Sequence, residues 1–444
     1  MNEPIPEDKR DERKMVYNFK FLTEEEVKRD SQKTNSIWFK VNDLYLFGAQ
    51  KTKFYDYVYS QPWRENEFAK DTIQTLYRWI FDDEIINYYV ETSQEVDKVL
   101  DIFIRTNRGG EPLSYSNLLM SFITAHWTRD TREAFHQLIL QIHEIGKPGF
   151  MVDADFLLKT CLVLFSNDIK FRLKNFDVKI VNEIDTNWER ISKSIKQAFY
   201  LVERWGFNDS NVRAKNALIP IAYYIYHHGI EEDIMNPLLY KEEKEDMRRW
   251  FCISLLKRVF GGQSDSVLVT VRKVLTDQID KSKFPLMEIK EAFRDNPSKN
   301  LSFDDEYING LLSLHKDDTS CYYVMALIYS HFQFSFQSYH QDHLHPAAYF
   351  MSLKRNEVNM SDEEFDYYKN RDNWDTIPNL QLLNDRMNES KNAKPLKDWV
   401  EDEKVDLDNQ LIPKDVSLDI KDFKTFIEKR KVVLRERLRK IIDS

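Results

Sequence analysis

The chain has 444 residues, 42% of them hydrophobic, so it is long enough for several domains with substantial cores. Its formal net charge of −10 excludes a general attraction to nucleic acid, so a polyanion could bind only at a local basic surface. No stretch approaches the ~18 consecutive apolar residues of a membrane span, and the N-terminal residues are charged. We therefore expect a cytoplasmic protein with no membrane partner.

The cysteines and glycines indicate the class of protein. The three cysteines, Cys161, Cys252 and Cys321, lie far apart in apolar segments, which predicts buried reduced thiols rather than disulfides. Only 10 glycines occur, well below the average of about 7%. We therefore predict a mainly α fold with a small α+β part.

The N-terminal third begins with about 35 charged and polar residues. Residues 37–41 are predicted to form a short strand or an apolar turn. From Asp71 the apolar residues recur three and four positions apart, which predicts a helix. That helix is expected to pass into a strand near residues 85–90.

A glycine corner follows, between two predicted helices capped by Ser93 and Ser114. Arg105, Asn107 and the backbone amide of Gly110 lie at this corner and could bind a nucleotide or phosphate. The alternative is an ordinary capped helix end with solvated polar side chains.

The middle of the chain, from about 127 to 315, is predicted to be helix after helix. The segments with helical periodicity are 134–145, 156–165, 181–207, 217–228, 242–259 and 264–275. Short polar breaks separate them, and no repeat of fixed length is present, so a solenoid is not indicated.

The C-terminal part is predicted to contain a strand, a loop, a second strand and a helix. Strict alternation of apolar and polar residues over 332–339 predicts a half-buried strand that ends at Asp342 and His343. After a polar and aromatic insertion, 347–375, residues 377–383 are predicted to form the second strand. A helix capped by Asn384 then runs through Asn388 to Lys391.

The last predicted helix, 423–442, has one apolar face and one basic face. The basic face carries Lys424, Lys429, Arg430, Lys431, Arg435, Arg437, Arg439 and Lys440. Such a face is usually solvated, but beside a phosphodiester site it could contact DNA phosphates. Lys429, Arg430 and Arg437 are the predicted DNA-backbone contacts.

The Asp342-His343 pair has the residue types that phosphodiester hydrolysis requires. The His343 imidazole titrates near neutral pH and can act as a general base. The Asp342 carboxylate and the Asn388 amide oxygen are hard ligands suited to Mg²⁺ or Mn²⁺. Adjacent strand residues face opposite ways, so a bend is expected here. In the alternative interpretation, His343 and His345 form a zinc pair.

The segments Asp342-His343-Leu344-His345-Pro346, Ile377-Pro378-Asn379-Leu380-Gln381-Leu382-Leu383 and Asn388-Glu389-Ser390-Lys391 closely resemble the HNH (ββα-metal) nuclease motif. The resemblance implies that His343 is the general base and that Asp342 and Asn388 are metal ligands. It further implies that Asn379 braces the loop that holds His343, and that Lys391 lies near the scissile phosphate.

The segments 103–114 and 260–268 look like parts of the ParB-like domain in GmrSD-type restriction endonucleases, which join such a domain to an HNH domain. This resemblance implies a partial ParB-like lobe (1–125), a helical domain (126–315) and an HNH nuclease domain (316–444). The family's Asp-Gly-Gln-Gln-Arg motif does not occur in this sequence. We therefore do not expect GTP, ATP or UTP hydrolysis by this chain.

The expected function is a metal-dependent DNA endonuclease of a restriction or phage-defence system that acts on modified foreign DNA. The alternative is a non-catalytic DNA-binding or regulatory remnant of such a nuclease. Expected partners are modified DNA, a second copy of the chain, or a separately encoded N-terminal segment.

Overall fold

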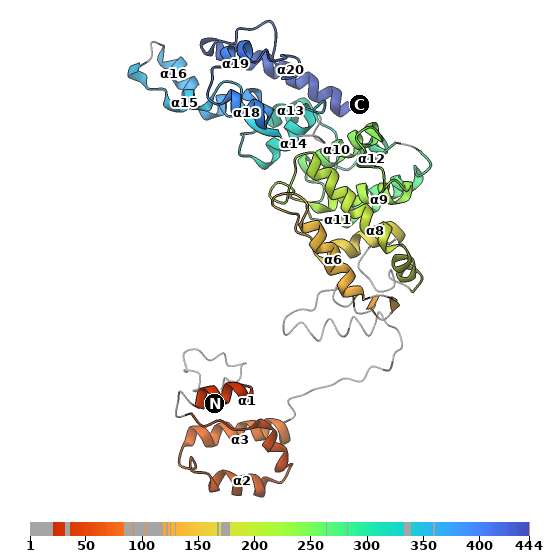
Figure 1. The fold of residues 1–444 in the computed structure, drawn as a ribbon, viewed down its shortest axis with the longest axis vertical. Helices are drawn as coiled ribbons and strands as arrows, with labels where there is room; N and C mark the ends of the chain where they lie inside the picture. Colours follow the sequence, from red (N-terminus) through yellow and green to blue (C-terminus); the bar gives the residue numbers. More distant parts are fainter. Residues whose placement is uncertain are drawn as a thin grey trace. The chain divides into compact units, whose positions relative to one another are not determined.

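The computed structural model describes residues 21–31, 36–83, 92, 102, 119–120, 123–124, 126–128, 130–166, 168–169, 178–262, 264–281, 283–332, 339–357 and 360–443. Contacts divide the chain into two compact units, Met1–Ser93 and Gln94–Ser444. The described parts are mainly helical and contain one two-stranded antiparallel sheet, which confirms the predicted fold class at this level (Figure 1). The three-domain division stays a prediction. None of the helices in these parts is long and apolar enough to cross a membrane.

The first unit is a small helical cluster. Its elements are α1 (Glu24–Ser31), the 3-10 helix η2 (Val41–Leu46), α2 (Lys51–Ser60) and α3 (Glu67–Phe81). Phe54 and Tyr77 stack in its core with ring centroids 4.0 Å apart, and the Tyr77 hydroxyl donates to the Gly48 carbonyl. Residues 36–40 form no strand. The predicted phosphate corner, with Arg105, Asn107 and Gly110, lies outside the described residues.

The second unit begins with a helical part. Its elements are α6 (Thr131–His143), α7 (Ala154–Phe165), α8 (Val178–Arg204), η5 (Lys215–Leu218), α9 (Ile219–His228), α10 (Lys241–Leu256), α11 (Ser264–Asp277), α12 (Leu286–Ala292), α13 (Asp305–Leu312) and α14 (Thr319–Ile328). The six predicted helices of this region are confirmed to within a few residues. Cys161, Cys252 and Cys321 are buried and unpaired, as predicted, and burial raises the pKa of each thiol to about 12.

The C-terminal part contains the sheet. Its elements are β1 (Tyr339–His343), α15 (Ala347–Ser352), η6 (Arg355–Glu357), α16 (Asp362–Lys369), α17 (Arg371–Trp374), η7 (Ile377–Asn379), β2 (Leu380–Asn384), α18 (Asp385–Lys391), α19 (Leu396–Asp402), η8 (Ile420–Asp422) and α20 (Phe423–Asp443). Asp342 and His343 end β1, opposite Gln381 and Leu380 of β2. Asn384 caps α18 by accepting from the Met387 amide. Strand, loop, strand and helix therefore follow in the predicted order. Residues 333–338 of the predicted first strand lie outside the described residues, and residues 377–379 of the predicted second strand form η7 instead.

The two faces of the sheet meet different parts of the protein. One face packs against the helical part, and the other faces α18. Residues directly opposite in an antiparallel pair share a face. Leu380 and Leu382 of β2 pack into the hydrophobic cluster of the helical part, whereas Leu383 joins a second cluster formed by the C-terminal elements. On the α18 face, His340 bonds to Asp385.

Helix α20 joins these two hydrophobic clusters. Phe423, Phe426 and Ile427 in its first turns are buried in the C-terminal cluster. Leu434 and Leu438 lie further along the same face and pack into the cluster of the helical part. The predicted apolar face of this helix therefore holds the sheet region against the helices that precede it.

Arg430 was predicted to contact DNA, but the structure shows that its side chain is buried. Its side chain is fully buried at 0% exposure, and all five guanidinium N–H groups find acceptors within the protein. The acceptors are the carbonyls of Pro378, Leu380, Gln410 and Leu411 and the hydroxyl of Tyr329, at 2.8–3.1 Å. Arg430 is thus a structural residue that holds the start of β2.

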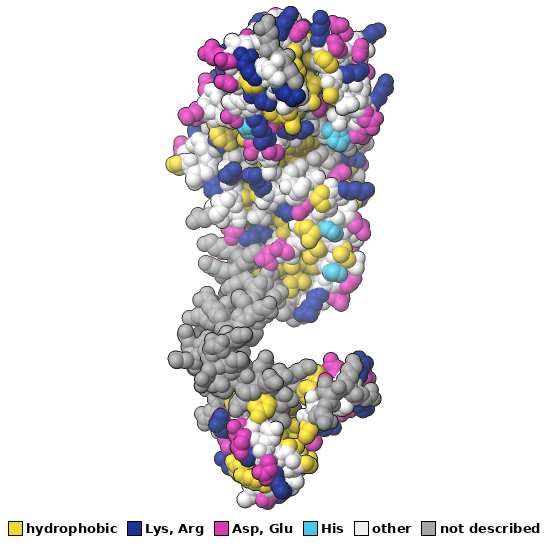
Figure 2. Space-filling model, turned by 90° about the vertical axis from the view of Figure 1, so that its left-hand side faces the viewer, with side chains coloured by type: hydrophobic (Ala, Val, Ile, Leu, Met, Phe, Trp, Pro, Cys, Tyr) yellow, Lys and Arg dark blue, Asp and Glu magenta, His cyan; other side chains and the backbone are white. Residues whose placement is uncertain are grey.

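Most other cations of α20 are also engaged by protein partners. Lys429 pairs with Asp415, and Arg439 pairs with Asp305. Arg437 is half-buried and donates to the Ser330 hydroxyl at 2.9 Å. On the face drawn in Figure 2, basic and acidic side chains are interspersed over the second unit. Lys429 and Arg437 are therefore weaker candidates for DNA contacts than the sequence suggested.

Replacing Arg430 is expected to destabilise the protein strongly. Arg430→Ala removes five hydrogen bonds to four carbonyls and the Tyr329 hydroxyl. Each buried acceptor left unpaired costs about 1–3 kcal/mol. Arg430→Lys is expected to recover little, because one ammonium cannot reproduce the planar five-donor geometry. The measurement is the midpoint of urea unfolding. Lys440→Ala, at an exposed position of the same helix, is the control and should stay within about 0.5 kcal/mol of the parent.

Candidate functional site

His343 is held at the end of β1 by a buried carboxylate. Its Nε2 lies 2.7 Å from Oδ1 of Asp375, and the two residues are only 7% and 4% exposed. Because a carboxylate accepts and does not donate, this contact places the proton on Nε2 and leaves the lone pair on Nδ1. Burial lowers the pKa of His343, and the Asp375 carboxylate partly opposes that shift.

Asp375 is itself held by Arg371 and lies near His315. Arg371, at the start of α17, directs Nε and Nη2 to the same oxygen, Asp375 Oδ2, at 2.8 and 2.6 Å. Nδ1 of His315 lies 3.5 Å from the same oxygen. The arrangement of base, carboxylate and fixed cation keeps the imidazole in one orientation.

Asn379 fixes the backbone on both sides of this pair. Its Oδ1 accepts from the His345 amide at 2.9 Å, while its Nδ2 donates to the carbonyls of His345 and Trp374 at 3.0 and 2.8 Å. Its own carbonyl accepts from the Leu344 amide at 2.8 Å. Asn379 therefore connects the residues that follow His343 with the residue that precedes Asp375.

Asp342 faces the opposite way from His343, toward α18. Its Oδ2 lies 3.5 Å from Gln381 Nε2 and 4.0 Å from Lys391 Nζ. Asn388 precedes Lys391 by three residues, so both project from the same side of α18. The Asn388 side chain is half-buried and has no hydrogen-bond partner among the described residues. The structure thus places Asp342, Asn388 and Lys391 at the junction of β1 and α18.

Lys391 is more deeply buried than a phosphate-binding surface lysine. Its side chain is 0% exposed, donates to the Lys394 carbonyl at 3.2 Å and lies over the Trp399 ring. Burial lowers its pKa to about 8, against the opposing effect of Asp342. An ammonium in this position partly neutralises the Asp342 carboxylate.

His343 and His345 do not share a site, as the zinc interpretation requires. His343 contacts Asp375, whereas His345 lies beyond the end of β1 with its ring edge-on to Phe423 and Phe426. Within the described ranges, no group of three or more His, Cys, Asp and Glu side chains could hold a metal ion. One carboxylate and one amide oxygen, as in Asp342 and Asn388, would leave the remaining positions around Mg²⁺ to water.

Sequence reasoning missed Asp375, Arg371 and His315. Asp375 closes the 347–375 insertion, which contains several other acidic residues, including Asp362, Glu364 and Asp372. Nothing in the local sequence distinguishes Asp375 from them, because its role depends on its contact with His343, which lies 32 positions earlier in the chain. The single local indication of this pair is the spacing of Arg371 and Asp375, which are four residues, or one helical turn, apart.

The comparisons with known proteins supply no family. A scan against models of protein families matches none, and a search of curated proteins finds no match.

His345 is expected to make stability depend on pH. Burial lowers its pKa to about 3, so the native state holds the ring neutral whereas the unfolded chain protonates near pH 6.5. The unfolded state therefore binds more protons below pH 6.5, and this contribution to stability is lost as pH falls from about 6.5 toward 3.

Replacing the ring tests this linkage. His345→Phe keeps an aromatic side chain against Phe423 and Phe426 but cannot titrate. The measurement is the free energy of unfolding from urea titrations across that pH range. The loss of stability in acid should be smaller for the variant than for the parent, and an unchanged pH profile would contradict the assignment.

Proposed function

We propose that the chain is a metal-dependent DNA endonuclease of the HNH (ββα-metal) type. The observation that carries the proposal is the Asn379 clamp, which fixes the segments bearing His343 and Asp375 beside a sheet and helix in the order strand, strand, helix. A histidine oriented by a carboxylate is an arrangement suited to general-base catalysis.

In the proposed reaction, His343 Nδ1 accepts a proton from the attacking water. Asp375 keeps the proton on Nε2 and stabilises the imidazolium that forms, while Arg371 holds Asp375 in place. Asp375 and Arg371 are thus positioning residues, because they act through His343. The base is active only when neutral, so cleavage is expected to be lost as pH falls below the pKa of His343.

Asp342 and Asn388 would hold a Mg²⁺ or Mn²⁺ ion at the junction of β1 and α18. Their carboxylate and amide oxygens suit these hard cations. The Asn388 side-chain amide has no hydrogen-bond partner among the described residues, so its oxygen is available as a ligand. When bound, such an ion stabilises charge on the phosphate and the leaving oxygen. His343 ends β1, so a phosphate at the strand end could meet the ion on one side and the imidazole on the other. Lys391 supplies a further positive charge there.

The resemblance to GmrSD-type enzymes extends the proposal to substrate and context. It supports modified foreign DNA as the substrate and restriction or phage defence as the role in a cytoplasmic setting. Nucleotide hydrolysis is not part of the proposal. Assembly with a second copy or with a separately encoded N-terminal segment would supply a sensing function.

A second function is a non-catalytic DNA-binding or regulatory remnant of such a nuclease. Two observations favour it. His343 is only 7% exposed, and the Lys391 ammonium lies 4.0 Å from the proposed metal ligand Asp342. A remnant would retain the fold of the site without turnover.

DNA cleavage separates the two functions. Unmodified, methylated and glucosylated plasmid DNA are incubated with Mg²⁺ or Mn²⁺, and nicked and linear products are quantified. The nuclease proposal expects cleavage that EDTA and His343→Ala abolish. Asp375→Asn should lower the rate by about a hundredfold or more, because the imidazole loses its orienting charge.

His340→Ala is the matched control, since His340 lies on the same strand but bonds to Asp385 on the α18 face. It should retain the parent rate, and thermal unfolding by circular dichroism should show that all variants are folded. Cleavage that survives His343→Ala would refute the assignment of the base. No cleavage of any substrate by the parent would favour the remnant.

A further inference from the structure

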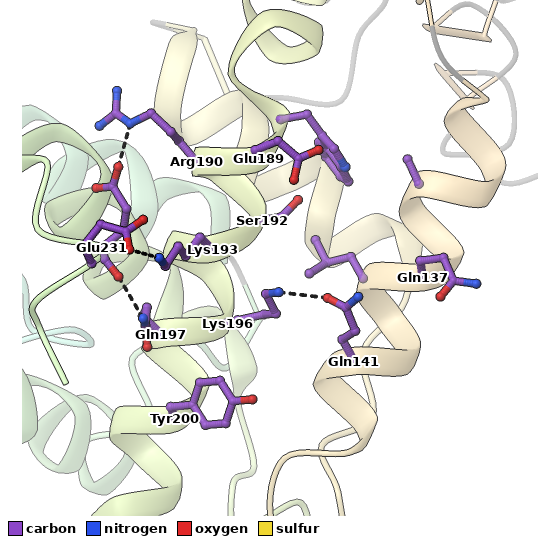
Figure 3. A pocket seen from close by; sticks show the side chains of 14 residues that line it. Gln137, Gln141, Glu189, Arg190, Ser192, Lys193, Lys196, Gln197, Tyr200 and Glu231 are labelled. Carbon is purple, nitrogen blue, oxygen red and sulfur yellow. Dashed lines mark hydrogen bonds and ion pairs between the residues drawn. The ribbon is translucent and has the colours of Figure 1, made fainter.

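A groove between α6 and α8 forms a cavity far from His343 in sequence. Its volume is about 560 Å³, which lies in the range of about 300–1,000 Å³ typical of small-molecule sites. Trp188 of α8 and Leu138 of α6 are among its apolar lining residues. Polar side chains from both helices also line it (Figure 3).

Ser192 is the first feature of this groove that points to a ligand. It is only 9% exposed, and its hydroxyl is buried without a hydrogen-bond partner. Figure 3 shows the hydroxyl directed from α8 toward α6. A helical serine ordinarily bonds to a carbonyl one turn earlier, as Ser194 does with Arg190. Because an unpaired buried hydroxyl is costly, an acceptor placed in the groove would be favoured.

Lys196 is the second feature, one helical turn from Ser192 on the same side of α8. Its Nζ donates across the groove to Gln141 Oε1 at 2.9 Å, which leaves two of its three N–H donors available. Within the part of the chain that the structure describes, no carboxylate lies within ion-pair distance of Lys196. Its positive charge is therefore compensated only by a neutral amide.

Four other charged side chains of the groove form two ion pairs, and the Glu189 carboxylate also lies in its lining. Arg190 donates to Glu231 Oε1 at 2.6 Å, and Lys193 pairs with Glu232. The second Glu231 oxygen, Oε2, is buried without a partner. Arg190 already neutralises that carboxylate, so Oε2 offers an acceptor for a hydroxyl or amine hydrogen rather than a site for a cation.

We propose that this groove binds a small hydroxylated oxyanion, a phosphate monoester or a carboxylate. The anionic group accepts from Ser192 Oγ and Lys196 Nζ, where the groove has a buried donor and an uncompensated charge. Hydroxyl groups on the rest of the ligand reach the polar side chains, Glu231 Oε2 among them. The site lies in the helical part and does not depend on the proposed nuclease function.

Isothermal titration calorimetry of the full chain, without DNA and at fixed ionic strength, tests the proposal. The probes are glycerol 3-phosphate and glycerate, which carry hydroxyls and differ in the anionic group. The stronger binder identifies the anion class. Lys196→Gln and Ser192→Ala should each weaken binding about tenfold or more, because each removes a donor to a charged group.

Lys193→Gln is the matched control, since its ammonium already pairs with Glu232, and it should bind like the parent. Ser192→Ala should unfold at the parent temperature or above, because the hydroxyl has no partner to lose. Saturable binding that these two substitutions weaken supports the site. Absence of binding by both probes, or equal affinity in all variants, overturns it.

Discussion

The carboxamide of Asn379 is the interaction on which the candidate site depends. Three hydrogen bonds from one buried side chain connect the turn after β1, the end of α17 and the start of β2. An amide is suited to this because it both accepts and donates, whereas a carboxylate could only accept. With Asn379 in place, the segments that carry His343 and Asp375 cannot move apart without breaking buried hydrogen bonds.

Arg430 supports Asn379 from the other side. Its Nη1 donates to the carbonyls of Pro378 and Leu380, the two neighbours of Asn379, at 2.8 Å each. It belongs to α20, whose apolar face joins the sheet region to the preceding helices. The last helix of the chain therefore determines the geometry of a loop fifty residues earlier. We infer that α20 contributes to the site through structure rather than through direct contact with a substrate.

Local patterns in the sequence predict the elements of the site but not its contacts. The second predicted strand, over 377–383, and the helix capped by Asn384 correspond to β2 and α18. The cap could be predicted because capping is a property of neighbouring residues. The burial of Arg430 could not be predicted, since a cation on a basic helix face ordinarily lies in solvent. Its acceptors lie far away in the sequence: the Tyr329 hydroxyl is 101 positions from Arg430 and the Pro378 carbonyl is 52. Four of the five acceptors are backbone carbonyls, which every residue has, so the sequence does not identify them.

The opposite orientations of Asp342 and His343 follow from the same strand geometry. Successive side chains of β1 point to opposite faces, so Asp342 meets α18 whereas His343 meets Asp375. The bend that the sequence led us to expect does not bring the two side chains together. The proposed metal ligands and the proposed base thus lie on two sides of the strand end.

The central claim is that Asp342 and Asn388 hold a cation independently of the base. Electron paramagnetic resonance of Mn²⁺, measured with a duplex oligonucleotide present, tests it directly. We predict that the parent protein and His343→Ala bind Mn²⁺ alike, and that Asp342→Asn and Asn388→Ala bind it at least tenfold more weakly. No Mn²⁺ binding by the parent, or binding that Asp342→Asn leaves unchanged, would contradict the account.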